Sequence, residues 1–215
     1  MEKQYRTFNI QCRTENDEEN ENKESYKVEG YASTFEEEYP MGEGENFRVF
    51  EKVSKDAFNN CQMDDVIFQY DHEGRVFART SNNTLSVVPD EHGLKVIADL
   101  GGTEEGRKLY NDIKGGYITR MSFAFTVRGL KEEKRKAESD GATEYIETIT
   151  DIARLFDVSA VSIPANDATE INARKYCENI EKRSKDEDEQ AKIDAEKERK
   201  AKERERLAVE LSLTI

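Results

Sequence analysis

Charged residues are concentrated in three blocks of this 215-residue chain, and this segregation limits what the chain can fold into. Asp, Glu, Lys and Arg make up 37% of the sequence and crowd into residues 14–25, 129–144 and 178–206. The stretches between the blocks hold most of the Val, Ile, Leu, Phe and Tyr residues. Because a core is built from such residues, we expect one compact domain of about 150 residues with charged appendages.

The apolar stretches are short and rich in β-branched and aromatic residues, which favours strands over helices. Strands are predicted at residues 4–12, 26–35, 84–88, 94–100 and 145–150. Turn residues between the third and the fourth of these predict a β-hairpin. Three helices are predicted: one over residues 54–60, one beginning after the capping residue Thr103, and one from the capping-box-like Asp167 and Glu170 through about Ile180. The pattern indicates an α+β domain dominated by strands.

Three of the strand-like runs carry a polar side chain of a type used in hydrolysis. His72 ends the run Phe-Gln-Tyr-Asp-His, and Ser122 lies in Met-Ser-Phe-Ala-Phe. Asp157 is flanked by Phe156 and Val158 in a third run. A base, a nucleophile and an orienting acid are the parts of a hydrolytic triad, so these residues form a hypothesis for a serine hydrolase.

Each member of the set also has a structural interpretation. A serine in an apolar strand is often a small core residue bonded to backbone, and Ser122 lacks the Gly-x-Ser-x-Gly elbow of α/β-hydrolases. Ser159 and Ser162 are weaker candidates for the nucleophile. The other histidine, His92, lies in the predicted hairpin turn and is expected to be structural.

Two alternatives involve the acidic residues. Asp157 can form a salt bridge with Arg154 instead of orienting a histidine. A metal site has ligands of the right type near His72 but no recognisable ligand spacing, and its members would be Asp64, Asp65, Asp71, His72 and Glu73. No metal and no cofactor are therefore expected.

Composition argues against several partners. The net charge of −14 disfavours nucleic acid, whose binding depends on Lys and Arg. Cys12, Cys61 and Cys177 are widely spaced and odd in number, which favours reduced thiols in an intracellular protein. The chain has no signal segment and no run of about 18 apolar residues, so no membrane partner is expected.

The order of short motifs resembles the prohead, or capsid maturation, serine proteases of tailed bacteriophages, a family similar in fold to the herpesvirus assemblins. The resemblance spans roughly residues 5–175. It is carried by Gly-Tyr-Ala-Ser-Thr-Phe at 30–35, Asp-Ala-Phe at 56–58, Tyr-Asp-His-Glu at 70–73, Ala-Arg-Thr at 78–80, Met-Ser-Phe-Ala-Phe at 121–125 and Asp-Val-Ser-Ala-Val at 157–161. Ala78 and Ala124 depart from the pattern, because the family often has glycine at both positions.

The resemblance implies a fold and a division of the chain. The expected fold is a closed antiparallel β-barrel surrounded by helices, in a protease domain over residues 1–177. Residues 14–25 and 129–143 would be mobile loops of that domain. Residues 178–215 would form a charged tail, either helical or disordered, that the enzyme removes from itself.

The resemblance also implies roles and partners. His72 would be the general base, Ser122 the nucleophile and Asp157 the residue that orients His72, although assemblins use a second histidine in the third role. The enzyme would act in the host cytoplasm, inside the prohead, on scaffold or on the scaffolding segment of the major capsid protein. Assemblin similarity favours a homodimer. The alternative is a non-catalytic capsid assembly or scaffolding factor.

Overall fold

A computed structural model describes residues 3–8, 13–14, 25–162, 177–180, 182–183, 185–186, 189–200 and 202. The chain divides into two compact units, residues 1–173 and 174–215. The loop predicted over residues 14–25 lies almost wholly outside the described residues, as do Cys12 and residues 163–176, which hold the start of the helix predicted from Asp167.

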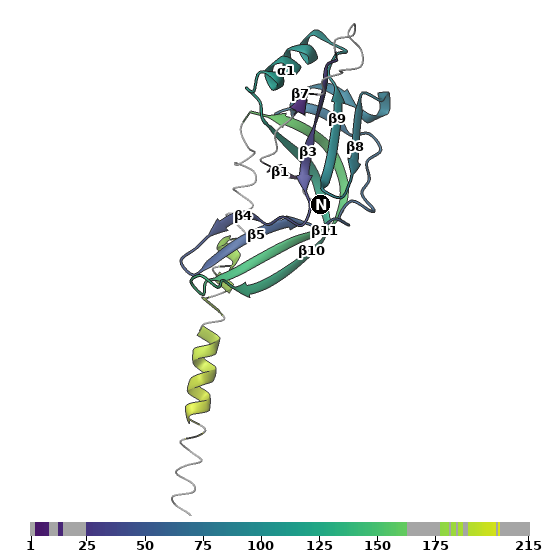
Figure 1. The fold of residues 1–215 in the computed structure, drawn as a ribbon. Helices are drawn as coiled ribbons and strands as arrows, with labels where there is room; N and C mark the ends of the chain where they lie inside the picture. The colour runs from purple at the N-terminus through teal and green to yellow at the C-terminus, as the bar shows by residue number, and fades with distance from the viewer. Residues whose placement is uncertain are drawn as a thin grey trace, which may run out of the picture. The chain divides into compact units, whose positions relative to one another are not determined.

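Two β-sheets build the first unit (Figure 1). The larger sheet has seven strands: β1 (Gln4–Phe8), β10 (Arg120–Lys136), β11 (Thr143–Val161), β5 (Phe47–Val53) and β4 (Tyr39–Glu43) in that order, with β6 (Ile67–Tyr70) on β11 and β7 (Glu73–Arg79) on β6. The smaller sheet has the order β2 (Arg13–Thr14), β3 (Lys27–Thr34), β9 (Gly93–Asp99) and β8 (Leu85–Pro89).

The hydrophobic core joins one face of each sheet to a single helix. The larger sheet contributes Phe68, Phe123 and Phe125, and the smaller one contributes residues such as Leu94 and Val96. Helix α1 (Glu104–Lys114) adds the buried side chains of Leu109, Tyr110 and Ile113. Its first turn is capped as predicted, because the Thr103 side chain accepts a hydrogen bond from the backbone N–H of Gly106. The predicted hairpin is also present as β8 and β9.

Strands β10 and β11 extend beyond the core and form an arm with β4 and β5 (Figure 1). Register shifts near Gly129 mark the point where buried positions of β10 give way to exposed ones. The sequence predicted a charged loop over residues 129–143, but residues 129–136 belong to β10 and β11 begins at Thr143. Backbone pairing with neighbouring strands gives these charged residues an ordered place that composition alone did not indicate.

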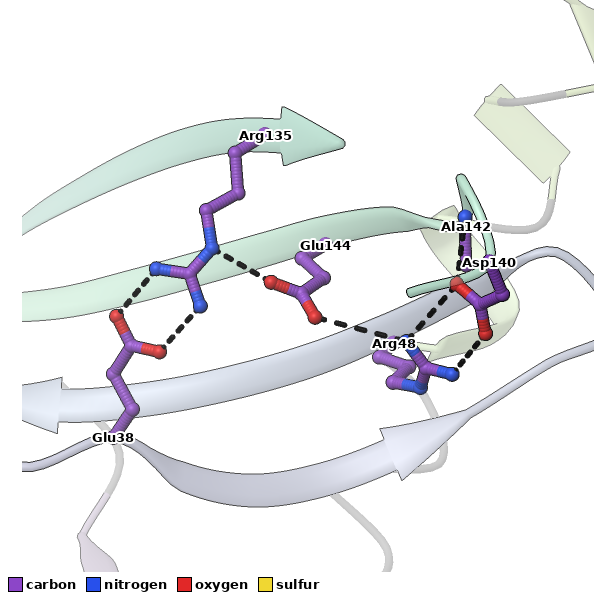
Figure 2. A network of polar contacts seen from close by, with 6 residues as sticks. All are labelled: Glu38, Arg48, Arg135, Asp140, Ala142 and Glu144. Carbon is purple, nitrogen blue, oxygen red and sulfur yellow. Dashed lines mark hydrogen bonds and ion pairs between the residues drawn. The ribbon is translucent and has the colours of Figure 1, made fainter. Parts of the chain in front are cut away.

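Ion pairs connect neighbouring strands of the arm (Figure 2). The Arg135 guanidinium holds Glu38 at 2.7 and 2.9 Å and Glu144 at 2.6 Å. Arg48 bridges Asp140 and Glu144, the latter at 3.7 Å. These ion pairs connect β5, β10 and β11 with each other and with the turn after β10, so opposite charges offset one another in this highly charged part of the sheet.

The predicted closed barrel is wrong. Both sheets of the described residues are open, and a single α-helix packs on the first unit instead of a surrounding set. The reason is that β11 pairs with two different parallel strands along its length. Residues 143–149 pair with β5, and residues 157–160 pair with β6. The two branches end at β4 and β7, and among the described residues neither of these strands pairs with β1, so the sheet does not close. The helix predicted over residues 54–60 is also absent, since these residues form turns.

The described part of the second unit is helical. Residues 189–200 form a continuous helix with exposed side chains, and pairs such as Glu196 with Lys200 at 2.9 Å lie one turn apart. Of the two states expected for the charged tail, the helical one holds for these residues. None of the helices in the described ranges is long and apolar enough to span a bilayer.

Candidate active site

Ser122 lies on the central part of the larger sheet. Its strand, β10, runs between β1 and β11, and Ser122 is opposite Thr7 on one side and Ser159 on the other. The neighbouring Met121 and Phe123 point into the core, so strand alternation turns Ser122 to the other face. The side chain is fully buried, at 0% exposure.

His72 lies in a two-residue turn rather than at the end of a strand. Tyr70 pairs with Glu73, and both Asp71 and His72 between them have positive φ, at 52° and 58°. Asp and His tolerate this left-handed region better than most residues, and two such residues in succession are typical of a type I′ hairpin turn. The turn carries the imidazole over the face on which Ser122 lies.

Asp71 fixes this turn to the end of β11. Its backbone N–H donates to the carbonyl of Ala160 at 3.0 Å. Its carboxylate accepts from the backbone N–H and from the hydroxyl of Ser162, both at 2.8 Å. The hydrogen bonds of Asp71 therefore fix the turn, and the turn positions the imidazole of the neighbouring His72.

The structure brings together the three residues predicted from the sequence. The Nδ1 atom of His72 is 2.5 Å from Oδ1 of Asp157, and its Nε2 atom is 2.7 Å from Oγ of Ser122. Asp157 is on β11, opposite Ala124 of β10, and only 1% of its surface is exposed. The Ser159 hydroxyl donates a further hydrogen bond to Asp157 at 3.2 Å.

The carboxylate of Asp157 is kept ionised by its surroundings. Burial alone would raise the pKa of Asp157, but the hydrogen bond and charge of His72 outweigh it. Lys3, with Nζ 3.1 Å from Oδ2 of Asp157, lowers the pKa further. The net pKa of Asp157 lies below its ordinary value, so a negative charge faces the Nδ1 side of the imidazole.

The N-terminal strand covers this site. Oγ of Ser122 is 2.7 Å from the backbone carbonyl oxygen of Arg6, so this oxygen and His72 Nε2 compete for the single hydroxyl proton. The ring of Tyr5 meets the His72 ring edge-on, with centroids 4.8 Å apart. Together with Lys3, these residues place the segment 3–6 directly over the three polar side chains.

The side chain of Arg6 points to a separate group of acids. Its Nε and Nη2 atoms donate to the two oxygens of Glu51 at 2.5 and 2.6 Å. Both residues are buried, at 7% and 4% exposure. Glu147 is the neighbour of Glu51 on β11. Burial raises the pKa of Glu147 to about 7, the charge of Glu51 raises it as well, and Arg6 opposes the shift.

The other sequence candidates lie elsewhere or have other partners. The ring of His92 packs on Tyr31, in the hairpin of the smaller sheet, with centroids 4.6 Å apart. Asp157 contacts His72 and Lys3 rather than Arg154. Both ring nitrogens of His72 are directed at Asp157 and Ser122, so neither is left for the proposed metal site. Among the residues that the structure describes, no group of three or more His, Cys, Asp or Glu could hold a metal ion.

Sequence reasoning missed the residues supplied by β1 and β5. Lys3, just before β1, and Tyr5, Arg6 and Glu51 carry no motif; the Lys3–Asp157 contact spans 154 positions of the chain and the Arg6–Glu51 contact 45. Asp71 was considered only as a metal ligand. The Asp-His-Glu-Gly sequence at 71–74 is turn chemistry, and it could have indicated that Asp71 holds a tight turn.

The arrangement has the chemistry of a serine hydrolase. A hydroxyl, an imidazole and an ionised carboxylate lie in hydrogen-bonded order, which is the order needed to move a proton from a nucleophile onto a base. The sequence model of the caudovirus prohead serine protease family matches residues 11–184. The chain belongs to this family and is a serine protease of the bacteriophage prohead. The family predicted from the sequence motifs is confirmed.

The other comparisons add no relative. No curated protein and no solved structure shows a significant match to the chain. The similarity to assemblins therefore stays a prediction.

Replacing Asp71 should disturb catalysis through the turn. Asp71→Ala removes the bonds to Ser162 and places alanine at positive φ, so we expect kcat to fall about 10 to 10²-fold with a smaller change in KM. Asp71→Asn keeps an acceptor oxygen and tolerates this backbone conformation, so it should retain most activity. Steady-state kinetics on one peptide substrate measure both. Equal activity of the two variants would contradict this role.

Glu147 should make stability depend on pH. A carboxyl whose pKa is raised from 4.5 to about 7 by folding binds its proton more tightly in the folded state. The folded state therefore loses stability as pH rises from about 4.5 to about 7, by about 1–3 kcal/mol. Glu147→Gln should remove this loss, whereas the exposed Glu45→Gln should not. Urea unfolding at several pH values measures the free energy of unfolding of each variant. Parallel pH profiles for wild type and Glu147→Gln would refute this role of Glu147.

Proposed function

We propose that Ser122 is the nucleophile, His72 the general base and Asp157 the orienting acid of this prohead protease. The observation that carries the proposal is the His72 ring, which lies within hydrogen-bond distance of Ser122 and Asp157 at the same time. Membership of a serine protease family supports it, because such an enzyme needs a serine with a base beside it.

Each residue has a defined part in the first half of the reaction. His72 Nε2 takes the proton of Ser122 as Oγ attacks the carbonyl carbon of the scissile bond. Asp157 stays ionised and accepts a hydrogen bond from Nδ1–H, which fixes the tautomer with a free Nε2 and stabilises the imidazolium that forms. The proton then passes from Nε2 to the leaving amine as the C–N bond breaks, which leaves an ester on Ser122.

The second half repeats these steps with water. His72 removes a proton from a water molecule, the resulting hydroxide attacks the ester, and Ser122 regains its proton from His72. Backbone N–H groups are suitable donors to the developing oxyanion. In the assemblin-like picture a loop after Pro164 would supply them, and that loop lies outside the described residues.

The substrates that we propose are proteins of the immature capsid. Family membership implies substrates related to the capsid and an enzyme located in the prohead. We propose that the enzyme cleaves scaffold or the scaffolding segment of the major capsid protein, inside proheads in the host cytoplasm, and that it then removes its own tail. Residues 1–177 are the proposed protease domain and residues 178–215 the removable tail. A homodimer is the proposed state.

Co-expression with the coat protein tests the triad. Wild type should shorten the coat protein or the scaffold, and Ser122→Ala and His72→Ala should reduce the rate by on the order of 10⁴-fold or more. Asp157→Asn keeps the shape but loses the charge, and should cost on the order of 10⁴-fold. Electrophoresis and mass spectrometry of the shell proteins give the result.

Matched controls separate chemistry from damage to the fold. Ser86 is exposed on β8 and His92 lies in the hairpin of the smaller sheet, so Ser86→Ala and His92→Ala should retain activity. Cleavage by Ser122→Ala at the wild-type rate would overturn the proposal. It would favour the alternative of a scaffolding factor with a contaminating protease.

Self-removal of the tail is tested by intact mass. Incubated wild type should lose a fragment through a cut between about residues 176 and 206, while Ser122→Ala keeps its full mass. An unchanged mass for both chains would count against self-cleavage while leaving the other substrates in place.

A further inference from the structure

A short segment, residues 3–8, contacts every member of the proposed triad. It consists of Lys3 and strand β1, which is the outermost strand on its side of the larger sheet among the described residues. We call it the cover segment. Its contacts with the triad are Lys3 Nζ to Asp157 Oδ2 at 3.1 Å, the Tyr5 ring to the His72 ring at a centroid distance of 4.8 Å, and the Arg6 carbonyl oxygen to Ser122 Oγ at 2.7 Å.

The cover segment is not held in place by the hydrophobic core. The side chains that are described in it, those of residues 3–6, are absent from the core cluster that the two sheets and helix α1 build. The segment is held instead by backbone pairing of Gln4–Phe8 with β10 and by polar contacts. One of these is the buried ion pair of Arg6 with Glu51, at 2.5 and 2.6 Å. Separation of the segment from β10 therefore leaves the core intact.

Ser122 cannot meet a substrate while the cover segment is in place. Its side chain is fully buried, and a scissile carbonyl carbon has to come within about 3–3.5 Å of Oγ. Among the described residues, Oγ has two polar contacts, His72 Nε2 and the Arg6 carbonyl oxygen. The reaction needs the first and has no use for the second. The cover segment is therefore the neighbour that has to move.

The same contacts hold the triad in an unreactive state. A serine hydroxyl has one proton to donate, so a hydrogen bond from Ser122 to the Arg6 carbonyl withholds that proton from His72. Lys3 shares the Asp157 carboxylate with His72 and neutralises part of the charge that stabilises an imidazolium. An ordinary edge strand has no need to engage the nucleophile and the acid in this way.

We propose that the cover segment is an autoinhibitory strand, so that the protease is latent while residues 3–8 pair with β10 and becomes reactive when they separate. The proposal rests on the triad function above and adds a control of that same site. Access to Ser122 is then set by the equilibrium between the paired and the separated state of the segment.

The ion pair of Arg6 with Glu51 sets this equilibrium. Glu51 is 4% exposed, and its neighbour in the register of β5 and β11 is a second acid, Glu147. When the cover segment separates, Glu51 loses its positive partner in a largely buried place, which is costly. The ion pair therefore favours the latent state.

Removing the charge of Glu51 should release the cover segment. In Glu51→Gln the Arg6 guanidinium stays buried without its partner charge in the latent state, and the separated state loses its penalty. We expect a fluorophosphonate to label Ser122 at least about 10-fold faster in Glu51→Gln than in wild type. Glu45→Gln, at an exposed position, should be labelled at the wild-type rate. Mass spectrometry of the full chain over time measures both rates.

A reversible cross-link tests the proposal most directly. Tyr5 lies opposite Ala124 in the pairing of β1 with β10, at a separation that a disulfide spans. Tyr5→Cys with Ala124→Cys is made in the full chain after its three native cysteines are replaced by alanine. Fluorophosphonate should label Ser122 in the reduced form, and at least about 10²-fold more slowly in the oxidised form. The matched control is Ser86→Cys with Ile97→Cys, which joins β8 to β9 and should be labelled equally in both forms.

The outcomes separate the latch from the triad. Equal labelling of the oxidised and reduced Tyr5→Cys, Ala124→Cys chains means that Ser122 is reached without separation of β1, which overturns the proposal while the triad stands. If that double variant does not fold, a labelling rate of Glu51→Gln at or below the wild-type rate overturns it. Absence of labelling in every variant also overturns it, because a separated cover segment should expose a reactive serine. Coat-protein cleavage by wild type then decides on the triad separately.

Discussion

The pairing register of β10 and β11 is the constraint on which the site depends. It sets Ser122 opposite Ser159 and Ala124 opposite Asp157, so that Ser122 and Asp157 lie on one face while Phe123 enters the core. A slip of one residue would exchange these faces and bury the hydroxyl among apolar side chains. The parallel pairing of β6 with the last residues of β11 then brings the His72 turn over the same face.

The sequence identified the three polar side chains but not the sheet that unites them. Ser122, His72 and Asp157 could be found because each is a reactive type in an otherwise apolar run. Strand pairing is non-local, so nothing near β11 indicated that it pairs with β5 at one end and β6 at the other, and a closed barrel was predicted instead. The charged residues 129–136 were expected in a loop for a similar reason, because the strands that support them lie far away in the sequence.

Buried charge distinguishes the N-terminal contact from an ordinary strand edge. The pair of Arg6 and Glu51 is almost wholly removed from solvent, and Glu147 beside it is held partly neutral near pH 7 by burial. Such an arrangement is a poor source of stability, since apolar residues of similar volume would pack as well or better.

The central claim is that His72 is bonded to Asp157 on one side and faces Ser122 on the other. Proton NMR of the full chain tests it directly, because an imidazole Nδ1 proton in a short bond to a buried carboxylate resonates far downfield. The account predicts one such resonance, present in wild type, Ser122→Ala and His92→Gln, and lost in His72→Gln and Asp157→Asn. Its absence from wild type, or its survival in Asp157→Asn, would contradict the account.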